Sequence, residues 1–265
     1  MKKIPFSKSI QLFPTLCTTA SMFCAFFSII RSINGEPIVA AWAIFVASFF
    51  DMIDGRIARM TKTQSEFGKE YDSLVDLASF GMAPSILVYT WTLSQYHQVG
   101  WFLSFLFFAC VALRLARFNV QVGVVEKKFF RGLPSPGAAC FMAAFVLFSE
   151  RFLGGSVRVV SVATLILVPL MALLMVSRIR YRSFKEFDVQ KKNSFYVLIG
   201  SAIFLGVVSI SPELVVFLVL CIYAFSGFVG ELFLYQKQKP ATEKTRSQTQ
   251  KLSIVELQKK TSPHE

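Results

Sequence analysis

Long apolar segments recur along the whole chain, and they restrict its fold more than any other feature. A helix needs roughly 20 consecutive apolar residues to cross the hydrocarbon core of a bilayer. Eight segments of the 265-residue chain come near or above this length. They are residues 10–30, 37–58, 71–93, 99–120, 136–152, 157–177, 195–210 and 214–235.

The overall composition also places the chain in lipid. Hydrophobic residues make up 54% of the sequence, 29 residues are Phe, and the mean hydropathy is +0.55. A soluble domain could hardly cover so much apolar surface. Because backbone polar groups must find partners within the bilayer, the spans have to be helical. We therefore predict an all-α, polytopic membrane helix bundle with about eight transmembrane helices.

Basic residues are distributed unevenly between the two ends of these spans. Lys and Arg are retained preferentially on the cytoplasmic side of a membrane. With eight spans, 25 of the 28 Lys and Arg residues fall on the side that carries both termini. The opposite loops hold only Arg31, Arg151 and Arg158. Both termini are therefore predicted to be cytoplasmic, in a bacterial-type inner membrane.

The formal net charge of +12 does not indicate nucleic-acid binding. The basic residues lie beside membrane spans rather than together on one soluble surface, so anionic lipid headgroups are the expected partners. Membrane lipids are therefore predicted to contact the chain, and nucleic acids are not.

The chain divides into three parts. Residues 1–177 contain the first six spans, whose short connections leave no room for a second folded unit. A basic linker and two further spans occupy residues 178–235. Residues 236–265 are rich in Lys, Gln, Thr and Ser, a composition typical of a disordered tail or a loose surface helix, here predicted to be cytoplasmic.

Acidic residues gather at one place in the sequence. Four of the five aspartates, Asp51, Asp54, Asp72 and Asp76, lie within 26 residues at the predicted inner ends of the second and third spans. The pairs are spaced three and four residues apart, so on helices each pair projects from one face. At about 1.5 Å per residue from Pro37, Asp51 lies roughly 21 Å along its span, near the cytoplasmic interface. Two antiparallel helices could therefore direct four carboxylates to one point.

Four carboxylates in a medium of low dielectric constant require cations or protons to neutralise them. Neither of the two histidines lies in the cluster, and the five cysteines form no C-x-x-C pair. An all-oxygen ligand set suits Mg²⁺ or Mn²⁺, which often bridge carboxylates to substrate phosphates. The cysteines are interpreted as small core residues. They are Cys17, Cys24, Cys110, Cys140 and Cys221.

The residues between the two pairs suit an anionic ligand. Gly55, Ala58 and Gly68 are small enough for a nucleotide to approach the backbone, and Arg59 supplies positive charge beside them. Intramembrane carboxylates also serve in ion and proton paths. Spacing alone therefore leaves two functions open, namely metal-dependent phosphoryl chemistry and the transport of cations or protons.

A resemblance distinguishes between these functions. The aspartates, Gly55, Ala58, Arg59 and Gly68 match without a gap the pattern D-x-x-D-G-x-x-A-R, eight residues, G-x-x-x-D-x-x-x-D. This pattern resembles the signature of the CDP-alcohol phosphatidyltransferases. The resemblance implies a six-helix catalytic core within residues 1–177, and it favours a transferase over a transporter. Apart from this motif, the ionisable side chains of the spans lie near their ends.

The resemblance also implies a role for each residue of the motif. Asp51, Asp54 and Asp72 would bind the metal ions that hold the diphosphate of a CDP-linked lipid. Asp76 would lie at the same metal site and act as general base on the acceptor alcohol. The remaining motif residues, Gly55, Ala58, Arg59 and Gly68, would shape the nucleotide pocket.

Three further segments indicate the acceptor. The residues from Leu77 to Ser85, from Leu113 to Asn119, and from Gly132 to Ala139 are similar to the branch of the family that uses L-serine. The implied substrates are CDP-diacylglycerol and L-serine, and the implied assembly is a homodimer. Another acceptor, such as glycerol 3-phosphate, is the alternative within the family. Arg114 and Arg117, three residues apart, are predicted to bind phosphate or carboxylate groups.

Overall fold

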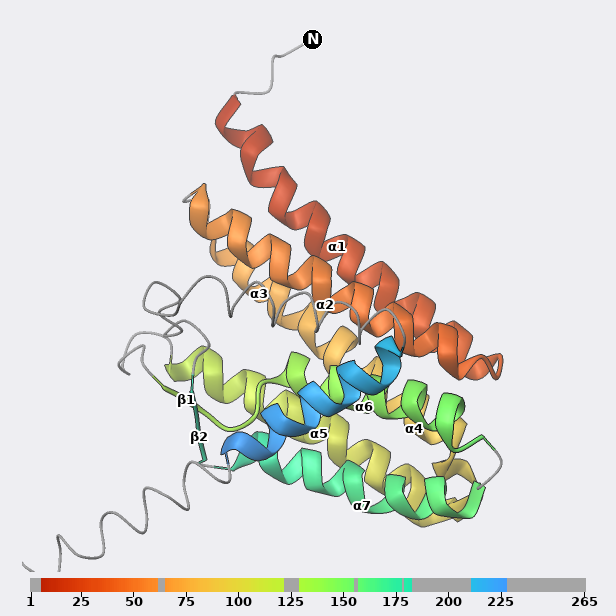
Figure 1. Ribbon diagram of the computed structural model, residues 1–265. Coiled ribbons are helices and arrows are strands. Elements are labelled where there is room, and N and C mark those ends of the chain that lie inside the picture. Colours follow the sequence, from red (N-terminus) through yellow and green to blue (C-terminus); the bar gives the residue numbers. More distant parts are fainter. Residues whose placement is uncertain are drawn as a thin grey trace, which may run out of the picture.

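The computed structural model describes residues 6–61, 65–121, 129–154, 157–177, 179–182 and 211–227. These residues form a bundle of long helices with one small two-stranded ladder (Figure 1). The helices are α1 (Phe6–Ile33), α2 (Pro37–Met60), α3 (Glu66–Asp76), η1 (Leu77–Met82), α4 (Ala83–Trp91), η2 (Leu93–Tyr96), α5 (His97–Gln121), α6 (Ser135–Phe152), α7 (Val157–Val176) and an unlabelled helix, Pro212–Gly227. The strands are β1 (Phe129–Arg131) and β2 (Arg180–Arg182).

The described helices agree with the predicted membrane bundle. Each of the first six predicted spans is helical, and α3, η1 and α4 form the third as one continuous segment, Glu66–Trp91. Five helical segments of the described chain are long and apolar enough to cross a membrane. The seventh predicted span, residues 195–210, lies outside the described residues. The eighth begins within Pro212–Gly227 and continues beyond the described part.

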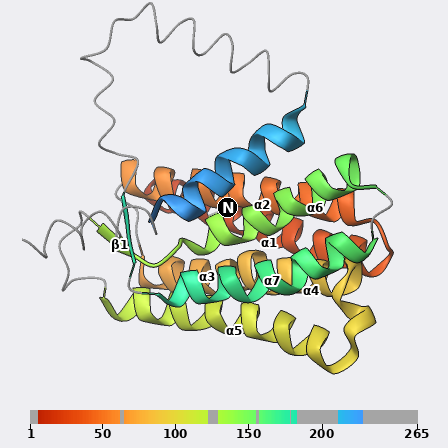
Figure 2. The same ribbon diagram turned by 60° about the horizontal axis from the view of Figure 1, so that its bottom comes forward.

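Helix α6 is the central helix of the bundle. Every residue from 138 to 147 is buried, and α6 contacts α2, α4 and α7. Figure 2 shows α6 in the middle, with α7 on one side and Pro212–Gly227 on the other. Its many alanines let neighbouring backbones approach closely, as is usual between helices in lipid.

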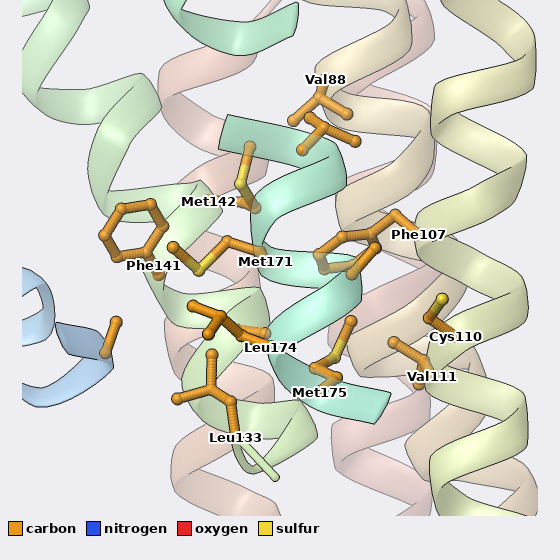
Figure 3. Close-up of a cluster of buried hydrophobic side chains, with 14 of the residues drawn as sticks. Val88, Phe107, Cys110, Val111, Leu133, Phe141, Met142, Met171, Leu174 and Met175 are labelled. Atoms are coloured by element: carbon orange, nitrogen blue, oxygen red, sulfur yellow. The ribbon is translucent and has the colours of Figure 1, made fainter. Parts of the chain in front are cut away.

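Two clusters of buried side chains hold the helices together. One joins α4, α5, α6 and α7, with Phe107, Met142 and Met171 at its centre (Figure 3). The other joins α1, α2, α4 and α6 around Ile44 and Phe80. Large apolar side chains elsewhere face outward, as lipid-facing residues do. Examples are Phe23, Phe26, Leu113, Leu173 and Ile222.

A tight turn joins α1 to α2 and sets their alignment. Gly35 has a φ of 77°, and Arg31 forms an ion pair with Glu36 across the turn at 2.9 Å. Pro37 then starts α2, a position where its missing N–H group costs nothing. The Ser28 hydroxyl donates to the Ala40 carbonyl at 2.8 Å, which links the two helices further along. The aspartates of α2 are thereby carried to the opposite end of the hairpin.

The two strands were not anticipated from the sequence. β1, before α6, pairs antiparallel with β2, after α7, in the register Phe130↔Tyr181. Gly132 follows β1 with a φ of 82°, and its amide donates to the Ile179 carbonyl at 2.8 Å. The ladder therefore ties the start of α6 to the end of α7.

Candidate functional site

The last turns of α2 carry the first pair of aspartates. Asp51 and Asp54 are three residues apart, so both side chains lie on the same side of the helix. Asp54 is only 4% exposed, and Asp51 is half-buried. The Oδ2 atom of Asp54 is buried and has no hydrogen-bond partner in the described part of the chain. A buried carboxylate oxygen without a partner is costly, so this oxygen is available to bind a ligand.

The second pair lies on α3. Ser65 caps this helix, because its hydroxyl accepts a hydrogen bond from the Gly68 amide at 3.0 Å. Asp72 and Asp76 follow one turn apart, and the helix changes from α to π geometry directly after Asp76. Such short π segments often occur at functional sites.

The two helices bring the carboxylates together, as the spacing predicted. One carboxylate oxygen from each of Asp51, Asp72 and Asp76 lies within 4.8 Å of the other two. Asp54 is beside this group and repels the charges of Asp51 and Asp72. We call these four residues the aspartate cluster.

The aspartate cluster fits a divalent metal ion. Among the residues that the structure describes, the one ion pair within 4.0 Å is the distant Arg31–Glu36 pair, so no cationic side chain neutralises the cluster at contact distance. In the same part of the chain, neither Cys nor His joins the group of possible ligand atoms. Oxygen ligands alone match the preference of Mg²⁺ and Mn²⁺. The Asp54 oxygen that has no partner among the described residues lies beside them.

Small residues and a guanidinium group line the α2 side of the cluster. A side chain at Gly55 would meet the Nη1 atom of Arg59 at 3.4 Å, so this guanidinium lies over the glycine. The charge of Arg59 also acts on Asp51, Asp54 and Asp72. Ala58 is half-buried on the same helix.

Gly68 lies on α3, inside the turn that Ser65 caps. A Cβ atom there would lie 3.1 Å from the Ser65 hydroxyl oxygen, which is closer than about nine in ten Cβ contacts. The small size of Gly68 therefore favours the Ser65 cap. Its predicted role in the nucleotide pocket is separate from this structural one.

The two arginines of α5 have different surroundings. Arg114 is close enough to Asp76 for their charges to interact, and its Nη1 donates to the Ser135 hydroxyl at 2.7 Å. Its Nε is buried without a partner in the described residues. Arg117 instead donates from Nη1 to the Val176 carbonyl, at 3.2 Å, near the end of α7. The structure therefore brings Arg114, but not Arg117, into contact with residues around the cluster.

Helix α1 adds a residue that the sequence did not single out. Thr18 is buried beside the Asp54 carboxyl group, and its hydroxyl donates to the Pro14 carbonyl at 3.0 Å. The Ser21 hydroxyl oxygen does not contact the cluster in this way; it lies 3.3 Å from the Ser79 hydroxyl oxygen and donates to the Ala47 carbonyl at 2.9 Å. Ser21 therefore links α1 to η1 and α2. The one sequence feature that could have identified Thr18 is its position, because it is a hydroxyl residue one helical turn after Pro14.

Two more residues near the site were missed. Ser135 lies within a segment that pointed to the acceptor, but no spacing rule identified its hydroxyl as the partner of Arg114. Tyr223, from Pro212–Gly227, interacts electrostatically with Arg114. Because Tyr223 is 109 residues further along the chain, no local pattern could connect the two.

The arrangement combines an acidic cluster with a cationic group on either side. Arg59 lies at the α2 side and Arg114 at the α5 side. Metal ions on the carboxylates, with guanidinium groups beside them, are a recurrent way to bind and polarise phosphate groups. The site is therefore suited to a diphosphate substrate in a membrane.

Comparison with known protein families agrees with this chemistry. A family model described as CDP-alcohol phosphatidyltransferase matches residues 11–176. The match contains the aspartate cluster, Arg59 and Arg114, whereas Pro212–Gly227 lies beyond it.

Several curated proteins are similar to the chain over most of its length. A CDP-diacylglycerol–serine O-phosphatidyltransferase of Helicobacter pylori is 34% identical over 230 residues, which is 86% of this chain and 94% of that protein. A protein of the same name from Mycobacterium leprae is 30% identical and covers 81% and 73%, respectively. An archaetidylserine synthase of Methanothermobacter thermautotrophicus is 35% identical over 63% of this chain and 68% of its own length.

Proposed function

Because the chain belongs to the CDP-alcohol phosphatidyltransferase family, we propose that it transfers the phosphatidyl group of CDP-diacylglycerol to L-serine. The products are phosphatidylserine and CMP. The convergence of Asp51, Asp72 and Asp76 oxygens within 4.8 Å, inside a membrane bundle, carries this proposal. The names of two relatives that align with 86% of this chain support serine as the acceptor.

The aspartate cluster is proposed to hold Mg²⁺ or Mn²⁺ through Asp51, Asp54, Asp72 and Asp76. When bound, the metal would neutralise the carboxylates and stabilise negative charge on the substrate diphosphate. The Oδ2 of Asp54 has no hydrogen-bond partner among the described residues, which supports its inclusion as a fourth ligand.

Asp76 is proposed to accept the proton of the serine hydroxyl. A serine hydroxyl is a weak nucleophile at neutral pH, so a base within hydrogen-bond reach lowers the barrier. The serine oxygen then forms a bond to the phosphorus that carries the lipid, and the bond from this phosphorus to the CMP oxygen breaks. The proton remains on the Asp76 carboxyl group and is later lost to solvent.

The two sides of the cluster are proposed to hold different substrates. Gly55, Ala58, Arg59 and Gly68, on α2 and α3, would receive the CDP part, because small residues there leave the backbone accessible. Arg114, near Asp76, would bind the serine carboxylate through its remaining N–H groups and its Nε, which has no hydrogen-bond partner in the described part of the chain. Arg117 stays a candidate for the diphosphate, with one N–H group already used on α7.

The cellular arrangement follows from the charge distribution. We place the protein in a bacterial-type inner membrane with the aspartate cluster toward the cytoplasm, where free L-serine and CDP-diacylglycerol meet. The proposed assembly is a homodimer.

The acceptor can be identified directly. Purified protein in detergent micelles would be supplied with CDP-diacylglycerol, Mn²⁺ and one acceptor at a time, and CMP and the product lipid would be measured. We expect CMP release with L-serine and a product that comigrates with phosphatidylserine. Release with glycerol 3-phosphate but not with serine would overturn the acceptor and leave the reaction class intact.

A further inference from the structure

Helix α3 carries half of the aspartate cluster, yet few of its side chains are buried. Within Glu66–Asp76, all of which the structure describes, Val75 is the one buried residue. Phe67 and Leu74 are 71% and 68% exposed, so apolar packing holds only one side of the helix. Polar contacts must therefore contribute to the rotation of α3 about its axis, and with it to the direction of its two aspartates.

Tyr71 connects α3 to α1. Its hydroxyl oxygen lies 3.0 Å from the hydroxyl oxygen of Thr19. The Thr19 hydroxyl donates its single proton to the Thr15 carbonyl at 2.8 Å, so it accepts in the contact with Tyr71, and the tyrosine donates. The Tyr71 ring also stacks on Phe67, one turn earlier, with 5.9 Å between the centroids. Both the ring and the hydroxyl therefore have a defined place.

Ser73 connects α3 to α5. Asn119, in the last turn of α5, donates from Nδ2 to the Ser73 hydroxyl oxygen at 2.9 Å. The Ser73 hydroxyl in turn donates to the Lys69 carbonyl at 3.0 Å, which leaves its oxygen to accept from Asn119. The proposed reaction gives Asn119 no chemical task, so this contact is the role that the structure offers for it.

The two hydrogen bonds lie on either side of Asp72. Successive residues of an α-helix differ by about 100° in direction, so positions 71 and 73 point to nearly opposite sides of α3. Helices α1 and α5 thus hold α3 from two sides (Figure 2). Asp72 lies between the two contacts, with one oxygen within 4.8 Å of an oxygen of Asp51. A rotation of α3 about its axis would stretch both hydrogen bonds.

We infer that Tyr71 and Asn119 are positioning residues for the metal site. Their hydrogen bonds to Thr19 and Ser73 set the rotation of α3 and keep the Asp72 carboxylate among the other ligands. The inference rests on the proposed function, because it requires a metal ion on the aspartate cluster. Metal ligands must be held to within about 0.5 Å by the residues that support them, so a small rotation of α3 weakens the site.

The first test is Tyr71→Phe, which keeps the ring on Phe67 and removes only the hydroxyl. The Kd of the purified protein for Mn²⁺, measured by electron paramagnetic resonance, should rise about fivefold, as expected for the loss of one hydrogen bond. Ser73→Ala removes the acceptor of Asn119 and should raise this Kd by a similar factor. At temperatures well below melting, a lower global stability alone would leave the Mn²⁺ Kd of the folded protein unchanged.

Thr19 provides the reciprocal variants. Thr19→Val removes the acceptor of Tyr71 while nearly keeping its shape, and it should raise the Mn²⁺ Kd as Tyr71→Phe does. Thr19→Ser keeps the hydroxyl and should bind Mn²⁺ like the parent. Because Tyr71 and Thr19 share one hydrogen bond, the effects of Tyr71→Phe and Thr19→Val should not add in the double variant. Thr19→Val also serves as the test if Tyr71→Phe does not fold.

Tyr89→Phe and Thr90→Val are the matched controls, and both lie on α4. Tyr89 is a half-buried tyrosine in an apolar groove with Trp101 and Phe105. The Thr90 hydroxyl donates to the Ile86 carbonyl at 2.9 Å, one turn earlier on its own helix, as Thr19 does to Thr15. Both controls should leave the Mn²⁺ Kd unchanged.

An unchanged Mn²⁺ Kd in either Tyr71→Phe or Ser73→Ala would overturn the inference, and so would an equal rise in the α4 controls. If the parent binds Mn²⁺ and transfers to serine in the same preparation, those results leave the proposed function intact. If the parent neither binds Mn²⁺ nor releases CMP with serine, the proposed function fails and the inference fails with it.

Discussion

The aspartate cluster assigns different tasks to residues of the same type. Asp51, Asp72 and Asp76 present oxygens within 4.8 Å of one another, and Asp54 is buried next to them. Asp76 differs from the others because it lies at the junction with the π segment and is close enough to Arg114 for their charges to interact. This position, between the proposed metal site and the proposed acceptor pocket, fits a group that takes a proton from the acceptor.

Replacing Asp76 by Asn tests this role. The amide keeps the shape of the side chain and its hydrogen-bonding capacity but removes its basicity, so turnover should fall about a hundredfold or more. Binding of CDP-diacylglycerol, measured separately, should persist. Asp188→Asn, at the aspartate outside the cluster, is the control and should retain parental turnover. Near-normal turnover in Asp76→Asn would remove this residue from the mechanism, and a joint loss of lipid affinity would make it mainly a metal ligand.

The other carboxylates make a separate prediction about metal binding. Replacing Asp51, Asp54 or Asp72 by Ala should weaken Mn²⁺ binding at least about tenfold, as measured by electron paramagnetic resonance of the purified protein. The melting temperature without metal should stay the same or rise, because closely packed carboxylates destabilise the fold. EDTA should abolish parental activity, and added Mg²⁺ or Mn²⁺ should restore it. Full activity in excess chelator would contradict the metal site.

At the scale of helices and strands, the sequence predicted what depends on local pattern. Apolar length predicted helices at the first six expected spans, and five helical segments of the described chain, α6 not among them, are long and apolar enough to cross a membrane. Aspartate spacing predicted the convergence of α2 and α3. The π segment Leu77–Met82 was not predicted, because it differs from an α-helix in its i→i+5 backbone hydrogen bonds, which the residue pattern does not signal. The contact of Arg117 with Val176 and that of Tyr223 with Gly137 join distant segments, so no local pattern contains them.

The β1–β2 ladder offers a test of how the bundle is held near the site. Gly132 has a φ of 82°, and a Cβ atom there would lie 2.2 Å from the Met175 carbonyl oxygen. Gly132→Ala therefore combines backbone strain with a clash against backbone. Gly35→Ala is the matched control, because Gly35 has a φ of 77° but no atom within 4 Å of the added carbon. Gly35→Ala should lower the free energy of unfolding only by the backbone strain, about 1 kcal/mol.

Thermal unfolding in detergent measures the difference between the two glycine variants. Gly132→Ala should lower the melting temperature clearly more than Gly35→Ala. It should also reduce turnover, since Gly132 immediately precedes the turn into α6 that carries Ser135. Equal melting temperatures would mean that the ladder contributes nothing to the stability of the catalytic core.

At the scale of the whole molecule, one end of the bundle holds the chemistry. The aspartate cluster lies at the C-terminal end of α2 and in α3. The α1–α2 turn lies at the N-terminal end of α2, and the start of α5 follows the far end of the continuous segment formed by α3, η1 and α4. CDP-diacylglycerol is anchored in the bilayer and L-serine is dissolved in water, so the reacting groups must meet near an interface. The charge distribution predicts that this interface is the cytoplasmic one.

Cysteine labelling tests the predicted orientation. In a variant without the five native cysteines, single cysteines would replace Gln98, an exposed residue at the start of α5, and Ser183, in the predicted cytoplasmic linker. An impermeant thiol reagent added to cells with a permeabilised outer membrane should label position 98 and not position 183. After the inner membrane is opened, both should react.

Each position is the control for the other. A position that does not react is informative only if the same position reacts once its own side of the membrane is exposed to the reagent. Labelling of position 183 with the inner membrane intact would contradict the distribution of 25 of the 28 basic residues on the cytoplasmic side. The cluster would then face away from the cytoplasm, where it could not use cytoplasmic serine. Labelling of position 98 alone would place an odd number of spans between it and the linker, and would support a cytoplasmic site at the C-terminal end of α2.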